Sequence, residues 1–270
     1  MSATSTTLPR VGTERLLAHT VTIYAKEIKY EFLKLLRLPV YSVSIIMFPV
    51  MFYVLFGLLL NRGHDVGGVS VAAYLMASYG TFGVMGASLF GFGVGVAGER
   101  GLGWLQVKRA SPMPPFAYFV AKTLVCMTFS FIIVSVLLIL GVAFGGVHMA
   151  FAQGAKLVMT LAAGASTFCA MGVAIGYFSG PTSASAIVNL IYLPLSFASG
   201  LWIPVDMLPS FIQRIAPFLP PYHLARLALG VVGVGNGSAF EHWEALGGFT
   251  LIFLGIARIG FQRDEGQTYG

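Results

Sequence analysis

Residues 98–115 read GERGLGWLQVKRASPMPP, and this stretch is a strongly charged break in an otherwise apolar part of the chain. Charge-free apolar runs flank it on both sides. Its prolines end any helix before them, because proline lacks a backbone donor and restricts the preceding residue. The stretch therefore predicts a short, basic interfacial helix over Glu99 to Ala110, of a kind suited to docking a soluble partner.

The composition decides the class of protein. Of 270 residues, 57% are hydrophobic and 10% are charged, whereas soluble domains carry about 25% charged residues. No single soluble core hides that much apolar surface, so the chain is predicted to be an all-α, polytopic membrane protein. The net charge of +6 then concerns membrane topology and not nucleic-acid binding. Cys126 and Cys169 lie in apolar segments without metal-ligand spacing, so no metal site is predicted.

Six charge-free or nearly charge-free segments predict six membrane spans, since about 20 apolar residues suffice to cross a bilayer. Lys122, near the start of the third, is expected to snorkel toward the headgroups, as is Arg258 in the sixth. The spans are expected at about 38–60, 69–97, 116–144, 154–178, 184–202 and 243–262. Residues 1–37 and 263–270 form tails around this domain of residues 38–262.

An amphipathic helix is predicted from Glu14 to Arg37, before the first span. Its apolar residues form one stripe at 100° per residue, with Lys26 and Arg37 opposite. The stripe consists of Leu17, Val21, Tyr24, Ile28, Phe32 and Leu35. Such a helix is expected to lie in the headgroup plane, either as an anchor alone or with a role in partner contact as well.

The distribution of basic residues predicts the orientation. Six spans place both termini on one side, and that side then holds twelve of the sixteen Lys and Arg residues. The other four are Arg62, Lys156, Arg214 and Arg226. Because cytoplasmic loops are enriched in basic residues, we expect both termini and the 98–115 loop in the cytoplasm, and the protein in the cytoplasmic (inner) membrane.

The segment 203–242 between the fifth and sixth spans differs from the other outer loops. It contains five prolines and two short amphipathic pieces, about 209–216 and 222–231, each too short to cross. Unpaired backbone cannot face lipid. We therefore expect two short re-entrant helices that dip into the outer leaflet or cap the protein.

Several motifs argue against other functions. Residues 93–98 match GxGxxG without the strand and acid that dinucleotide binding requires. The small residues Gly83, Ala87, Gly91 and Gly95 instead predict close helix packing. The sequence contains no GxxxxGK[ST] motif, so any ATP hydrolysis is expected on a separate polypeptide.

Ionisable residues are almost absent from the predicted spans. This argues against ion-coupled transport and against an intramembrane enzyme. The histidines are expected as scattered interfacial residues: His19, His64, His148, His223 and His242. Asn189, in the fifth span, is expected either to form an interhelical hydrogen bond or to line a substrate path.

The chain resembles the ABC-2 type permeases, the membrane subunits of bacterial ABC exporters, over nearly its whole length. The resemblance includes the helix before span one, the six spans, and GLWIP at 200–204 after span five. It also includes the family's cytoplasmic motif E-R-E-x-G-T-L-E-x-L…[ST]-P, of which Glu99, Arg100, Gly103, Leu105 and Ser111-Pro112 are kept. Gly101 replaces the second acid of that motif and Trp104 replaces its threonine.

The resemblance implies that residues 99–110 form a coupling helix that docks on a cytoplasmic ABC ATP-binding subunit. The implied contacts are Glu99, Arg100, Gly103, Trp104, Leu105, Lys108 and Arg109. Glu99 is expected in the first turn of this helix, acting as a cap or in contact with the ATPase. ATP and magnesium would bind to that subunit, and this chain would hold no cofactor.

The resemblance further implies a permease dimer, formed by two copies or by two close relatives, with an outer gate and a substrate path. The gate would include Trp202, Pro204, Pro209 and Phe211, and the candidate path residues are Asn189, Tyr192 and Phe197. The charge-poor spans favour export of a hydrophobic or amphipathic substrate, such as a drug or a lipid-linked or glycan-type molecule. The rival interpretations are an energy-independent channel or scaffold without an ATPase partner, and a membrane-embedded enzyme.

Overall fold

The structure is a computed structural model that describes residues 13–60, 63–66, 68–111, 113–235 and 237–268. It confirms the all-α fold class, and the described residues add only a two-stranded antiparallel hairpin, β1 (Asp65–Val66) with β2 (Val69–Ser70). The tail 1–12, Arg62 and Pro112, all used in the predictions above, lie outside the described residues.

Within the described residues, five helical segments are long and apolar enough to cross a membrane. They cover Tyr41–Leu60, Val71–Gly101, Phe116–Phe144, Phe151–Phe178 and Ala239–Asp264. The first two are composite, because each contains a π-helical part. The elements are α2 (Pro39–Phe52) with η1 (Tyr53–Leu60), α3 (Val71–Ser88) with η2 (Leu89–Val94) and α4 (Gly95–Gly101), α6 (Pro115–Phe144), α7 (Phe151–Phe178) and α11 (Ala239–Thr268).

The region predicted as span five and the outer segment contains shorter helices. α8 (Ala184–Ala198) has 15 residues and is therefore about 22 Å long, less than the hydrocarbon thickness of about 30 Å. The following helices are η3 (Val205–Met207), α9 (Ser210–Ile215), η4 (Ala216–Phe218) and α10 (Pro220–Val232). The chain bends by 89° between Phe218 and Pro220, so α9 to α10 forms a broken span or a re-entrant pair at the place where short helices were predicted.

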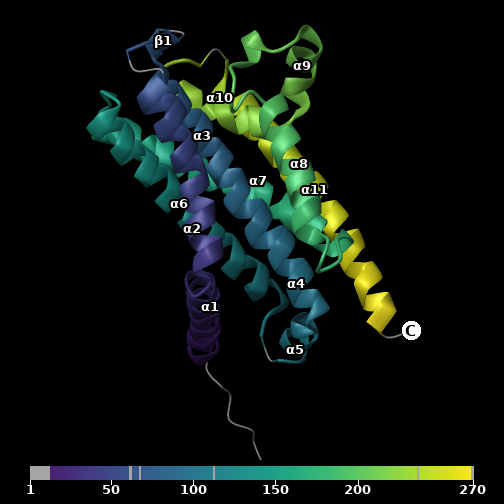
Figure 1. Cartoon of the computed structure of the whole chain (residues 1–270). Helices are drawn as coiled ribbons and strands as arrows, with labels where there is room; N and C mark the ends of the chain where they lie inside the picture. The colour runs from purple at the N-terminus through teal and green to yellow at the C-terminus, as the bar shows by residue number, and fades with distance from the viewer. Residues whose placement is uncertain (1–12, 61–62, 67, 112, 236, 269–270) are drawn as a thin grey trace, which may run out of the picture.

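The two ends of the bundle carry different elements (Figure 1). α9, α10 and the β-hairpin lie at one end, whereas α5 (Trp104–Ala110), α1 (Thr13–Leu36) and the last turns of α11 lie at the other. The predicted coupling segment, the amphipathic helix and the C-terminal helix end therefore share one face of the protein. This agrees with the expectation that these segments share one side, while the cytoplasmic assignment of that side stays a prediction.

α3 forms the centre of the bundle. Every residue from Val71 to Ser88 is buried, and α2, α6, α7 and α10 pack around this helix. Small residues make the contact possible: a Cβ on Gly83 would lie 2.7 Å from Ile133 Cγ2, and one on Gly91 would lie 2.9 Å from Cys126 Sγ. The prediction that this stripe serves close helix packing is confirmed.

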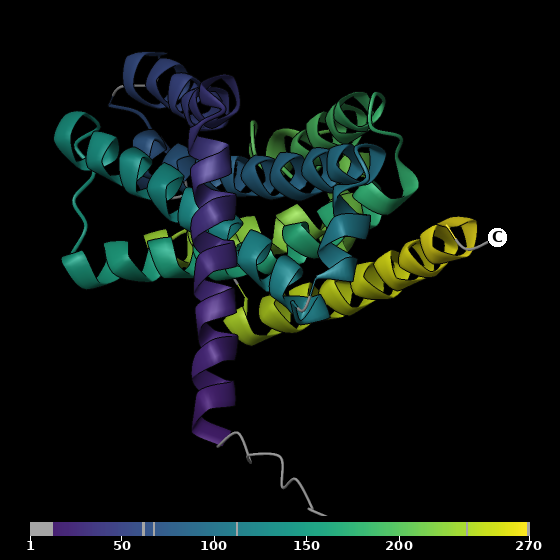
Figure 2. The ribbon, with the colours of Figure 1, turned by 90° about the horizontal axis from the view of Figure 1, so that it is seen from below.

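α1 crosses the end of the bundle and packs against α6 and α2 (Figure 2). Its helical extent agrees with the predicted amphipathic helix. Ile28 and Phe32 pack against the core, while Val21 is 66% exposed. The face toward the bundle also carries charge, since Glu31 is only 5% exposed.

Candidate functional site

The segment predicted as one helix from Glu99 to Ala110 is broken in the structure. α4 ends at Gly101, Gly103 adopts the left-handed conformation with φ +74°, and α5 begins at Trp104. The prediction of a continuous helix is wrong, because a glycine in the left-handed region ends α4 before the next helix starts. At the other end of α5, the Ser111 hydroxyl donates to the Lys108 carbonyl at 2.7 Å.

This break changes the role of Glu99. The residue lies in the last turn of α4, not in the first turn of α5, and is 6% exposed. Its carboxylate accepts hydrogen bonds from the Tyr118 hydroxyl at 2.6 Å, from Lys122 Nζ at 2.9 Å and from Lys34 Nζ. Glu99 is therefore an internal ion-pair partner. The predicted capping role in the first turn is wrong, whereas the contact with an ATPase subunit stays a prediction.

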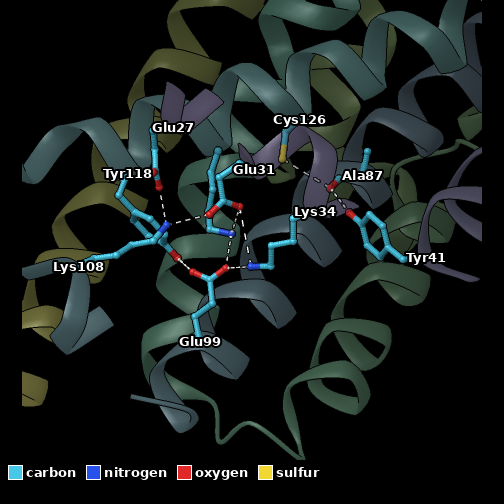
Figure 3. A network of polar contacts seen from close by, with 10 residues as sticks. Glu27, Glu31, Lys34, Tyr41, Ala87, Glu99, Lys108, Tyr118 and Cys126 are labelled. Carbon is cyan, nitrogen blue, oxygen red and sulfur yellow. Dashed lines mark hydrogen bonds and ion pairs between the residues drawn. The ribbon is translucent and has the colours of Figure 1, made fainter. Parts of the chain in front are cut away.

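Glu99 belongs to a larger group of charges, which we call the α1 ion network (Figure 3). Lys122 Nζ lies 3.1 Å from Glu31 Oε2, and Lys108 Nζ lies 2.9 Å from Glu31 Oε1. The network comprises Glu27, Glu31 and Lys34 of α1, Glu99 of α4, Lys108 of α5, and Tyr118 and Lys122 of α6. Its three carboxylates balance its three ammonium groups, and together they join four helices.

The electrostatics of the network favour the charged forms. Burial raises the pKa of Glu31, but the positive charges of Lys122, Lys34 and Lys108 outweigh it, so this pKa lies below its usual value. Burial lowers the pKa of Lys108, but bonds to Glu27 and Glu31 outweigh it and raise this pKa. The expectation that Lys122 snorkels is wrong, because it is 5% exposed and turned toward two carboxylates.

The neighbouring Arg100 points to the other side of α4. Its Nη1 donates to the carbonyls of Gly176 and Tyr177 at 2.9 Å each, and its Nη2 donates to Asp264 Oδ1 at 2.8 Å. A guanidinium at the end of α7 satisfies carbonyls that have no helical partner and complements the helix dipole. Glu99 and Arg100 thus tie α4 to α1 and α6 on one side and to α7 and α11 on the other.

The surface that α5 offers to a partner is apolar. Leu102, Trp104 and Val107 are 75%, 55% and 61% exposed. Leu105, predicted as a contact with the ATPase, is buried at 7% exposure, and the side chains of Arg100 and Lys108 bind within the chain. A dock held by these two basic residues stays a prediction, and it would require them to give up or share these intrachain contacts. The Arg109 side chain lies outside the described part of the chain.

The structure separates the three predicted path residues. Asn189 is exposed and its amide donates to the Ser185 carbonyl of its own helix at 3.1 Å, so within the described chain it forms no interhelical bond. Tyr192 is buried and donates to the Phe82 carbonyl at 3.1 Å. Phe197 is 40% exposed on the outside of the chain. Asn189 and Phe197 therefore do not share a cavity with Tyr192.

The predicted gate residues lie at the end of the helix bundle opposite α5. Trp202 packs on Phe52 and Phe82, with ring centroids 5.2 and 5.7 Å away, and its buried indole nitrogen has no hydrogen-bond partner among the described residues. Pro204 and Pro209 precede η3 and α9, and Phe211 of α9 is 63% exposed. Trp202 thus belongs to an aromatic wall, whereas Phe211 faces outward.

Sequence reasoning missed the acidic members of the network. Glu27 and Glu31 are separated by one helical turn and border the apolar stripe that contains Ile28 and Phe32. A pair of acids on the packed face of a helix, together with Lys122 inside a span, is the signal that could have indicated buried ion pairs.

Comparison with known proteins gives two matches. Residues 27–232 match the ABC-2 type transporter family. The chain is also 26% identical over 245 residues to the protein named "Putative transport permease YvfS" of Bacillus subtilis (strain 168), a match that covers 91% of this chain and 99% of that protein. The family match begins at Glu27 and so includes the ion network.

Proposed function

The chain belongs to the ABC-2 type transporter family, and on this premise we propose that it is the permease subunit of an ATP-driven exporter in the cytoplasmic (inner) membrane. Permeases of this family generally work with an ABC ATP-binding subunit. In this proposal ATP and magnesium bind to that separate cytoplasmic subunit, which docks on α5. The substrate is a hydrophobic or amphipathic molecule that moves outward, and both termini of the permease lie in the cytoplasm.

The observation that carries the proposal is the exposed apolar face of α5. Trp104 and Val107 project from this short helix, and Leu102 from the turn before it, at the end of the bundle where a membrane protein meets water. Exposed aromatic and aliphatic side chains on such a surface are typical anchors of a protein interface. Leu105, which is buried, and Lys108, which binds Glu27 and Glu31, attach α5 to the permease, so a force on α5 is passed to other helices.

Ion contacts and hydrogen bonds connect α5 and α4 to the other helices, so a movement of α5 can be passed on. Lys108 joins α5 to α1, and Glu99 joins α4 to α1 and α6. Arg100 joins α4 to α7 and α11. An ATPase that contacts α5 differently in its two nucleotide states would shift α5 and, through these contacts, the five helices joined to it, since only such differential contacts can bias a conformational equilibrium.

A second permease copy is part of the proposal, because an ATPase dimer offers two docking sites and one chain supplies one α5. The outer face of α8 supports it: Asn189 is exposed there, beside Leu190 at 75% and Phe197 at 40% exposure. The Asn189 amide already bonds to the Ser185 carbonyl, but an exposed polar side chain is still less favourable against lipid than against a partner helix or a substrate path. The neighbouring aromatic rings of Phe52, Phe82 and Trp202 pack together inside the chain and do not themselves line a cavity.

Co-purification tests the proposal. The permease is expressed together with a candidate ABC ATPase, and the retained ATPase and its substrate-stimulated activity are measured. We expect Trp104→Ala with Val107→Ala to release the ATPase, while Phe151→Ala, at a 92% exposed residue of α7, retains it. Transport that proceeds without any ATPase would favour the energy-independent channel. Unchanged retention of the ATPase by the α5 double variant would refute docking on this face.

A native mass measurement tests the dimer. We expect two permease chains for every two ATPase chains in the active complex, and a cysteine in place of Leu190 should cross-link between copies. An active complex with a single permease chain, either alone or with an unrelated membrane protein, would contradict this part of the proposal.

A further inference from the structure

A pocket of about 210 Å³ lies between α7, α10 and α11, away from the coupling segment. Its polar and aromatic lining comes from Lys156 and Thr160 of α7, Arg226 of α10, and His242 and Trp243 in the first turns of α11. Gly235 and Gly237, between α10 and α11, add backbone to its wall. α10 lies at the end of the bundle opposite α5 (Figure 1), so this pocket and the α5 dock are far apart.

The charge at this pocket is unbalanced, in contrast to the α1 ion network. No carboxylate of the described chain lies within ion-pair distance of Lys156 or Arg226. Arg226 packs its guanidinium over the Tyr222 ring, 5.1 Å from the centroid. Glu241 neighbours His242 along α11, but it is exposed and does not line the pocket. Two uncompensated cations on one small pocket attract an anion.

The His242 ring offers the pocket a polar nitrogen in addition to the charged groups of Lys156 and Arg226. The Pro217 carbonyl can only accept, so His223 Nε2, 2.9 Å away, carries a hydrogen. In neutral His223 the Nδ1 atom then accepts, and His242 Nδ1, at 3.0 Å, donates to it. This assignment follows from the hydrogen-bond pattern. It leaves His242 Nε2 toward Gly237, where in the neutral ring it can accept a hydrogen bond from a hydroxyl group of a bound phosphate or of its headgroup.

The pocket lies at the depth of lipid headgroups. Lys156 is near the start of the span Phe151–Phe178, and Trp243 is near the start of the span Ala239–Asp264. Tryptophan and lysine at the ends of spans occupy the membrane interface. The N-terminus of the 30-residue α11 also lies here, and its first-turn N–H groups and dipole favour a negative charge.

From these observations we infer that the pocket binds a phosphate group, with Lys156 and Arg226 as its charged ligands and Thr160 and His242 as polar ones. Its volume is several times the roughly 30 Å³ that one water molecule occupies in the liquid, so a phosphate fits. The phosphate can belong to the headgroup of an anionic phospholipid in the outer leaflet or to a free phosphate ion. The inference does not depend on the ATPase partner or on the exported substrate.

Lipid binding to the purified full-length chain tests the inference. Phosphatidylglycerol is titrated into the detergent-solubilised protein, and bound lipid is counted by native mass spectrometry. We expect Lys156→Gln and Arg226→Gln to weaken binding about fivefold each, and the double variant about 25-fold, from the usual contribution of a basic residue near an anionic lipid. Arg214→Gln, which removes a basic residue of α9 outside the pocket, is the matched control and should change binding less than twofold.

Inorganic phosphate distinguishes the two sources. If millimolar phosphate raises the melting temperature of the wild type but not of the double variant, the site takes the free ion. If only phosphatidylglycerol shows the dependence on these residues, the site takes a lipid headgroup.

The inference is wrong if neither probe distinguishes the double variant from the wild type, or if Arg214→Gln weakens binding as much. A charge-retaining variant, Lys156→Arg with Arg226→Lys, guards against misfolding. It should keep most of the binding, and its loss in a monodisperse protein would show that charge is not the cause.

Discussion

Replacing Glu99 with glutamine tests whether the α1 ion network holds the coupling end of the protein together. The substitution keeps the shape of the side chain but removes the charge that faces Lys34, Lys122 and Tyr118. Removing one partner of a buried ion pair costs about 3–5 kcal/mol, because the other charge stays buried without compensation.

The structure places this variant near the lower end of that range. Lys122, which is 5% exposed, loses one of two carboxylates but keeps Glu31 at 3.1 Å. The Lys34 side chain is 44% exposed and can turn to water, so its loss adds little. We therefore expect the free energy of unfolding to fall by about 3 kcal/mol. Adding Lys122→Met removes the excess cation, leaves two carboxylates with two ammonium groups, and should restore at least half of the loss.

Equilibrium unfolding in mixed detergent and dodecyl sulfate micelles, followed by circular dichroism, measures these differences. Glu244→Gln is the matched control, since Glu244 is exposed on α11, and it should stay within about 0.5 kcal/mol of the wild type. The reasoning fails if Glu99→Gln is as stable as this control, or if the double variant is no more stable than Glu99→Gln alone. In either case the observed contacts would not contribute as a buried, coupled network.

Three further expectations concern the same end of the protein and the topology. Gly103→Ala should lower the free energy of unfolding by about 1–2 kcal/mol, because φ +74° is unfavourable for alanine. Gly98→Ala is the control and should not lower it, because a Cβ at Gly98 meets no atom within 4 Å. Equal effects of the two variants in a denaturation experiment would contradict the assignment of strain to Gly103. The pKa of Glu31 is lowered in the folded chain, so its contribution to stability is present above the ordinary carboxyl pKa of about 4.3 and is lost as the pH falls through the lower folded value. The melting temperature should therefore show no network-dependent fall between pH 7 and pH 5 and should drop below about pH 4, and Glu31→Gln should reduce that drop; a fall that already begins at pH 6 would indicate another group. Cysteines at Gln106 and Ser210 should react with an impermeant maleimide from opposite sides of the membrane, Ser210 from outside; reaction of both from one side would overturn the topology.

The membrane class and most of the helices followed from composition and from charge-free runs alone. A bilayer requires each spanning segment to be a long apolar helix. Whether a segment meets this requirement depends on its own residues and not on the rest of the chain. The same holds for the small residues at Gly83 and Gly91, whose spacing reports a close helix contact. Residues 99–110, the expected coupling segment, lie on α4 and α5 at the end of the bundle that also carries α1, and their role as a dock stays a prediction.

The roles of individual side chains at that site depended on tertiary structure. Glu99 and Lys108 are 65 and 77 positions away from Lys34 and Glu31 along the chain, and no local pattern shows that these pairs meet. The same is true of His223 and His242, which were expected as scattered residues but lie 3.0 Å apart. The sequence around a charged residue of an amphipathic helix is the same whether its side chain faces water or another helix. The sequence alone therefore does not show which of the two applies.

What the sequence determined by itself is therefore that the protein lies in a membrane, where five of its six expected spans lie, and the place of its charged break; it did not determine that α8, at the expected fifth span, is only 15 residues long. Those properties depend on local composition, because the free energy of transferring a segment into lipid is set by the residues of that segment. Which charges are buried together was decided only by packing, because the free energy of an ion pair depends on a distance of a few ångströms between helices that are remote in the chain.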